Sequence, residues 1–166
     1  MSINIQVYRV FASEFDALTK LTENQLEILL FGQEGGTGWV MEPGRMIDLE
    51  KAYDAVDYVI TGDSSPPVAS FLLGGGDETI DYEFTYGPGR IFAPARTATI
   101  AAELSGLSRE TIDARLNDTA VMVERYPFDG RYDANDREWV AGAFEKLRRF
   151  VLSAADSGCG LLVGSS

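Results

Sequence analysis

The two ends of the chain carry the hydrophobic patterns of β-strands. Ile3, Ile5 and Val7 alternate with polar residues over the first ten positions, which is the period-two pattern of a half-buried strand. Residues 159–163 form a short apolar run that is typical of a buried strand. We therefore predict one strand at each end of the chain.

Between these ends, apolar residues recur at steps of three and four, the spacing that places them on one face of a helix. Local signals mark helix starts: Thr22 with Gln25 has the form of a capping box, and Pro94 suits a first helical turn. Gly62 and Gly158 are placed to end two of the helices. The predicted helices cover residues 13–18, 22–31, 48–61, 94–105, 108–116 and 134–157.

These elements predict an α+β fold. The chain has no internal repeat and no linker long enough to separate two domains. We therefore expect residues 1–166 to form a single compact domain. In it, a small mixed sheet that holds the N- and C-terminal strands packs against several helices.

The composition removes several catalytic mechanisms. The chain has no histidine and one cysteine, so it can form no Ser-His-Asp triad, Cys-His pair or HExxH zinc site. Cys159 cannot form an intramolecular disulfide, and its apolar neighbours favour a buried small hydrophobe over a reactive thiol. No acidic motif resembles a calcium-binding loop. We therefore expect neither a cofactor nor a metal site.

Acidic residues outnumber basic ones by 26 to 14, which gives a formal net charge of −12. This charge argues against sequence-independent binding to nucleic acid, which depends on basic residues that neutralise phosphates. Four of the seven residues in 77–83 are acidic. That run indicates either a solvated loop or an acidic face for a basic protein partner.

The chain shows no signal for export or for a membrane. Its first residues lack a basic segment followed by an apolar one, and no apolar run approaches the ~18 residues of a membrane span. We expect a cytoplasmic protein that does not bind membranes. The sequence leaves its oligomeric state open.

Three blocks of sequence carry a family resemblance. They are residues 50–62, 86–94 and 122–127, and their order and spacing resemble the YfbM-like family of bacterial proteins, a domain of unknown function. The resemblance spans nearly the whole chain. It implies a small cytoplasmic α+β protein, and it assigns no catalytic residue or cofactor.

The chain departs from that family within the first block. The family often has tryptophan and then histidine at the positions that Tyr53 and Asp57 occupy here, and Asp-Lys where this chain has Glu50-Lys51. A mechanism that required this histidine could not operate in this chain. Either the position is structural across the family, or this member has lost or altered an activity.

The three blocks supply the candidates for a ligand-binding or structural cluster. Arg90 follows a Gly-Pro-Gly turn, where its guanidinium could hold a carboxylate or phosphate, satisfy helix-end carbonyls or pair with Glu124. Lys51 could bind an anion or act as an activated amine, or it could pair with Asp54 or Glu50 at the surface. The candidates are Lys51, Tyr53, Asp57, Thr61, Tyr86, Arg90, Glu124 and Tyr126.

Two functional hypotheses follow. The first is a non-enzymatic interaction module whose acidic surface binds a basic protein; an immunity- or antitoxin-like role belongs here by analogy, because inhibitors of basic effectors are often small and acidic. The second is an enzyme or small-anion-binding protein with a pocket around Lys51, Arg90 and Tyr126. In the enzyme, Glu124, Asp57 or Tyr126 would act as general acid or base.

Overall fold

Five strands form one antiparallel sheet in which the first and last strands of the chain are neighbours. The computed structural model describes residues 3–34, 36–63 and 70–166. The predicted α+β class and the two terminal strands are confirmed. In their order across the sheet, the strands are β2 (Met46–Asp48), β1 (Ile5–Val10), β5 (Gly160–Ser165), β4 (Gly87–Phe92) and β3 (Glu78–Phe84).

Neighbouring strands of this described sheet are antiparallel throughout, so the sheet is not mixed as we predicted. β3 and β4 are joined by a tight hairpin, and a turn that short permits only antiparallel pairing. The long connection from β4 to β5 leaves and re-enters the sheet at the same end, where Phe92 pairs with Leu161. These two connections account for the relative directions of β3, β4 and β5, which the hydrophobic pattern does not specify.

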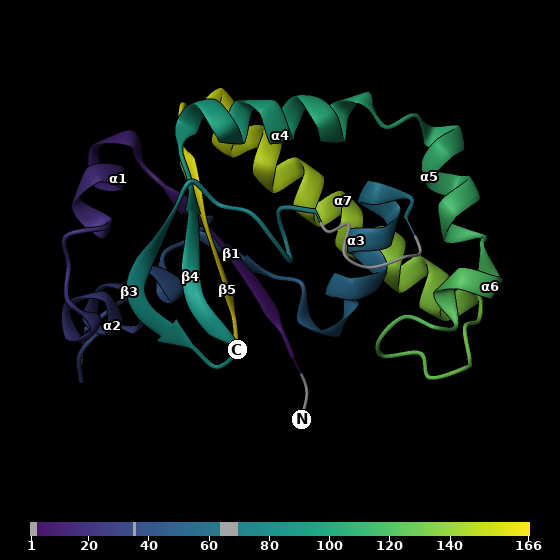
Figure 1. Cartoon of the computed structure of the whole chain (residues 1–166), viewed down its shortest axis with the longest axis horizontal. Coiled ribbons are helices and arrows are strands. Elements are labelled where there is room, and N and C mark those ends of the chain that lie inside the picture. Colours follow the sequence, from purple (N-terminus) through teal and green to yellow (C-terminus); the bar gives the residue numbers. More distant parts are fainter. Residues whose placement is uncertain (1–2, 35, 64–69) are drawn as a thin grey trace.

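Helices cover both faces of the sheet. α1 and α2 pack on the face that carries Tyr8 and Leu162, whereas α3, α4 and α7 pack on the face that carries Val7 and Val163 (Figure 1). Because consecutive strand residues point to opposite faces, β1 and β5 are buried on both sides rather than on one. The helices are α1 (Ala12–Leu18), α2 (Glu23–Phe31), α3 (Tyr53–Thr61), α4 (Pro94–Gly106), α5 (Arg109–Leu116), α6 (Thr119–Met122) and α7 (Ala134–Asp156).

Local signals set several helix ends as predicted. The Gln25 N–H donates to Thr22 Oγ1 (3.4 Å) and the Thr22 N–H donates to Gln25 Oε1 (3.0 Å), which forms the capping box of α2. Gly62 ends α3 with a left-handed backbone, φ +66°. The start of α3 differs from the prediction: Asp48 is the last residue of β2, and the helix begins at Tyr53 after a 3-10 turn. Pairing of β2 with β1 holds Asp48 in the sheet.

The acidic run 77–83 contributes to a strand and is not the predicted solvated loop. It supplies most of β3, the edge strand, in which Ile80 and Phe84 are buried while Asp81 and Glu83 are exposed. The period-two pattern was present but obscured by the number of acidic residues. Exposed charges on an edge strand disfavour pairing with the edge of another sheet.

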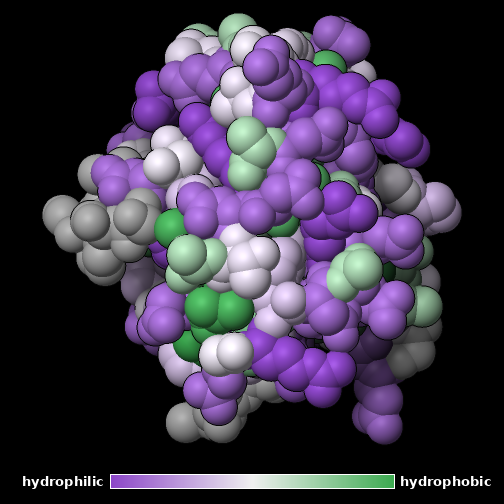
Figure 2. Space-filling model, turned by 90° about the vertical axis from the view of Figure 1, so that its right-hand side faces the viewer, coloured by the Kyte–Doolittle hydropathy of each residue, from purple (hydrophilic) through white to green (hydrophobic). Residues whose placement is uncertain are grey.

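Hydrophilic residues dominate the face of the molecule that includes α5 and α6, and the apolar spots there are small and separate (Figure 2). In the parts of the chain that the structure describes, no helix has both the length and the apolar composition that crossing a membrane requires. Most of the large apolar side chains of the described residues lie in two cores, one on each side of the sheet.

Candidate functional site

A cavity of about 220 Å³ lies near both ends of the described chain. Segments far apart in the sequence line it (Figure 1). They are the residues at the start of β1, the start of α3, the turn at residues 71–73, the β3–β4 hairpin and the end of β5. The fold therefore creates a site that no single sequence block contains. Its lining residues are Ile3, Ile5, Tyr53, Leu72, Leu73, Tyr86, Pro88, Arg90, Val163, Gly164 and Ser165.

Among the described residues that line the cavity, Arg90 alone carries a charge. Its Nη1 donates to the carbonyl oxygens of Phe71 (3.0 Å) and Gly74 (2.6 Å), and its Nη2 donates to that of Leu72 (2.6 Å). These bonds hold the turn against β4, and no described carboxylate pairs with the guanidinium. Burial lowers the pKa of Arg90. Of the alternatives for Arg90, carbonyl binding is observed, although the carbonyls belong to a turn and not to a helix end.

Two tyrosines add hydroxyl groups to the cavity. Tyr53 is 8% exposed, and its hydroxyl has no hydrogen-bond partner among the described residues. Burial, reinforced by the charge of Asp54, raises the pKa of Tyr53 to about 12. Like an ordinary tyrosine, it is protonated near neutral pH and can donate a hydrogen bond. Tyr86 and Leu73 are each 39% exposed and form the rim.

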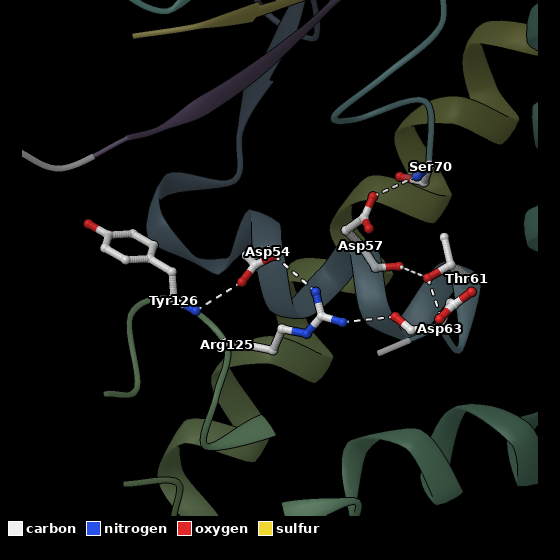
Figure 3. A network of polar contacts seen from close by, with 7 residues as sticks. All are labelled: Asp54, Asp57, Thr61, Asp63, Ser70, Arg125 and Tyr126. Atoms are coloured by element: carbon white, nitrogen blue, oxygen red, sulfur yellow. Dashed lines mark hydrogen bonds and ion pairs between the residues drawn. The ribbon is translucent and has the colours of Figure 1, made fainter. Parts of the chain in front are cut away.

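A polar network joins the first and third sequence blocks (Figure 3). Asp54 Oδ1 lies 3.3 Å from Nη1 of Arg125, and Asp54 Oδ2 accepts a hydrogen bond from the Tyr126 N–H at 2.9 Å. Nη2 of Arg125 donates to the carbonyl oxygen of Asp63 at 2.8 Å. The Tyr126 ring packs on Tyr53 with ring centroids 5.8 Å apart. Tyr126 therefore supports a cavity residue and does not itself line the cavity.

Asp57 and Thr61 form hydrogen bonds within α3 and to the residues that follow it in the sequence (Figure 3). Asp57 is 2% exposed, and its Oδ1 accepts a hydrogen bond from the Ser70 N–H at 2.8 Å. Thr61 Oγ1 donates to the Asp57 carbonyl at 3.0 Å and accepts from the Asp63 N–H at 3.2 Å. The position where the family often has histidine is therefore a buried structural contact in this chain.

We expect Asp57→Asn to stabilise the protein at neutral pH. Burial raises the pKa of the Asp57 carboxyl, an effect that the Ser70 hydrogen bonds oppose without cancelling. Ionisation therefore costs more in the folded protein than in the unfolded chain, and the free energy of unfolding should fall as pH rises from about 3.9 through the raised pKa. The asparagine side chain of the variant cannot ionise, yet its oxygen can still accept from the Ser70 N–H.

Urea unfolding followed by circular dichroism, from about pH 4 to pH 7, measures the two stability curves. Asp113→Asn, which also removes one negative charge but from an exposed side chain on α5, is the matched control. The expected result is that the Asp57→Asn curve rises above the wild-type curve as pH increases. Parallel curves for Asp57→Asn and the wild type would contradict the prediction.

A second hollow of about 520 Å³ lies between the end of α3 and α4. Its charged lining residues, Arg96 and Glu103, are both exposed. Exposed charges remain hydrated and gain little from a ligand. The smaller cavity, with a half-buried guanidinium and a buried phenol, is the better candidate site.

The remaining candidates lie away from the cavity. Lys51 is exposed in the 3-10 turn before α3, and it forms no ion pair with any described residue; its predicted partner Asp54 binds Arg125 instead. Glu124 is also exposed, and within the described structure it makes no contact with Arg90. The structure thus brings Tyr53, Tyr86 and Arg90 together and leaves Lys51 and Glu124 outside.

Sequence reasoning did not single out two arginines that organise this region. Arg125 lies between the candidates Glu124 and Tyr126 in the third block, and this position could have identified it as a candidate. Arg115 lies outside all three blocks, so the resemblance gave no indication of it. Nη1 of Arg115 donates to the carbonyls of Val59 (2.7 Å) and Ile60 (2.9 Å) at the end of α3. Within the described chain, no group of three or more Cys, Asp or Glu side chains is placed to hold a metal ion.

Comparisons with known proteins agree with this architecture. The model of a domain of unknown function (DUF1877) matches residues 1–164. The crystal structure of a protein of unknown function, YfbM from Escherichia coli, has a TM-score of 0.64 and 14% identity to this chain over 100% of both, which shows a shared fold. None of the curated proteins compared with the chain matches it. The chain therefore belongs to the DUF1877 family of unknown function, in agreement with the YfbM-like resemblance of its three sequence blocks.

Proposed function

We propose that this protein is a non-enzymatic binding domain that takes a small anion into the cavity beside Arg90. The observation that carries the proposal is the uncompensated charge of Arg90, whose partners among the described residues are three neutral backbone carbonyls. A cation that is partly removed from water is costly unless an anion compensates it. An anionic ligand in the cavity would supply that compensation.

The groups around the cavity favour binding over catalysis. A general base needs a pKa near the working pH, whereas the phenol of Tyr53, with a pKa of about 12, stays protonated. Arg90 offers only hydrogen-bond donors. The described lining residues thus present donors to a ligand and contain no nucleophile paired with a base.

The basic protein partner expected from the net charge stays a prediction. Glu23 and Glu27 of α2 lie near Tyr82 of β3, and burial together with their charges raises the pKa of that tyrosine. A net negative charge would attract many basic proteins, so it does not identify a particular partner. The cavity, which combines charge with shape, therefore carries the proposal.

Thermal unfolding in the presence of small anions tests this function. We expect at least one of acetate, benzoate, phosphate and sulfate to raise Tm by about 3 °C at roughly ten times its Kd, because a ligand that binds only the folded state stabilises it. Differential scanning fluorimetry measures the shift. Chloride salts at the same ionic strength separate binding from general salt effects.

Two tryptophan variants test whether the anion that raises Tm binds in the cavity. Leu73→Trp enlarges a side chain at the rim of the cavity and should abolish the shift. Met41→Trp makes a similar change at a side chain that is 68% exposed and lies outside the cavity, and it should preserve the shift. Equal shifts in both variants, or no shift with any of the anions, would overturn the proposal.

A further inference from the structure

The cavity places a charged edge beside apolar walls. Apolar side chains that keep accessible surface come from Ile3, Leu73 and Pro88. Arg90 and Tyr53 supply polar groups. A small, fully hydrated ion such as phosphate would leave the aliphatic walls without an apolar contact. The lining therefore favours an anion that carries an apolar body.

Arg90 retains hydrogen-bond donors for such a ligand. A guanidinium has five N–H donors, of which the turn uses three. The Nε–H and the second N–H of Nη2 have no partner among the described residues, and Nε is accessible to solvent. These two donors can share one edge of the guanidinium, with a spacing that matches the two oxygens of a carboxylate.

The volume limits the apolar body to a single ring. A dry cavity of about 150 Å³ holds benzene, whereas pockets for drug-sized ligands begin at about 300 Å³. At about 220 Å³, this cavity lies between the two. One aromatic ring with a carboxylate matches that volume, and a nucleotide exceeds it.

We propose that the anion is a single-ring aromatic carboxylate, an inference that rests on the proposed anion-binding function. The carboxylate binds the free edge of Arg90 and the hydroxyl of Tyr53, which are donors of the cavity without a partner among the described residues. The ring packs against Leu73 and Pro88 and faces Tyr86 at the rim. The turn that Arg90 already holds keeps the guanidinium in one orientation, which lowers the entropic cost of binding.

Isothermal titration calorimetry with benzoate as the probe tests this assignment. Benzamide has the same shape without the charge, and inorganic phosphate has charge without the ring. We expect each to bind at least about tenfold more weakly than benzoate, because each loses either the charge-assisted hydrogen bonds or the apolar contacts. These comparisons use the unmodified protein, so they do not depend on any variant folding.

A matched pair of variants tests the position of the carboxylate. Tyr53→Phe removes the hydroxyl and should weaken benzoate binding about tenfold. Tyr82→Phe makes the same change on β3, at a ring that packs on Phe31 and does not line the cavity, and should leave the affinity unchanged. Circular dichroism confirms that both variants are folded.

The outcomes separate this inference from the proposed function. If acetate or phosphate binds as tightly as benzoate, and Leu73→Trp abolishes that binding, the aromatic class is wrong while anion binding stands. If benzamide equals benzoate, or if Tyr53→Phe binds benzoate as the wild type does, the assigned carboxylate contacts are overturned. If none of these anions binds, the inference and the proposed function fail together.

Discussion

Asp54→Ala is expected to lower the free energy of unfolding by about 3 kcal/mol. The Asp54 carboxylate pairs with Arg125 at 3.3 Å and accepts from the Tyr126 N–H at 2.9 Å. The side chains of Asp54 and Arg125 are 22% and 15% exposed, so the variant leaves a mostly buried cation and a backbone N–H without this partner. Urea unfolding followed by circular dichroism measures the loss.

An exposed ion pair provides the control for this prediction. Arg109 and Asp113 lie 3.7 Å apart on α5 with side chains 94% and 58% exposed, and Asp113→Ala should cost no more than about 0.5 kcal/mol. Asp54→Asn keeps an oxygen that can accept from Tyr126 and should cost less than Asp54→Ala. A loss for Asp54→Ala as small as that for Asp113→Ala would show that the network does not stabilise the fold.

Arg90→Met is expected to lower the free energy of unfolding by about 2 kcal/mol. The variant leaves three turn carbonyls without their donor, and water can reach only part of the turn because Phe71 and Leu72 are buried. Methionine preserves much of the aliphatic packing, so the loss reports mainly on hydrogen bonds. Chemical denaturation measures the stability.

The destabilisation caused by Arg90→Met should also be concentrated in the turn that Arg90 holds. The amides of Leu73 and Gly74 both donate to the Ser70 carbonyl within the turn that Arg90 holds, and their hydrogen exchange should accelerate more than that of β1. Arg109→Met, on a side chain that is 94% exposed, is the matched control and should change neither stability nor exchange. Unchanged exchange at Leu73 and Gly74 in Arg90→Met would contradict the structural role of Arg90.

The helix ends are the features that could be predicted most directly. The capping box of Thr22 with Gln25 and the left-handed Gly62 are formed as predicted, because both depend on backbone groups within a few residues. Asp48 was assigned to a helix start from the same kind of signal, but its place in β2 depends on pairing with β1. Nothing near Asp48 in the sequence encodes that distant partner.

The candidate site also combines features that nearby residues predict with features that depend on distant partners. The sequence singled out Tyr53, Tyr86 and Arg90 from the blocks that resemble a family, and these three line the cavity. It paired Lys51 with Asp54 because they are three residues apart, whereas the structure pairs Asp54 with Arg125, 71 positions away. Spacing along a helix predicts which neighbours can meet, but it does not rank them against partners brought close by folding.

By itself, the sequence determined the secondary structure at both chain ends, most helix boundaries, the family and the absence of every histidine-dependent mechanism. Those properties depend on residue types and on contacts within a few positions. Only the tertiary structure decided that Arg90 holds a turn without a described acidic partner and that its cavity is walled by β1 and β5. The physical reason is that burial and charge compensation are set by segments that meet only when the sheet has formed.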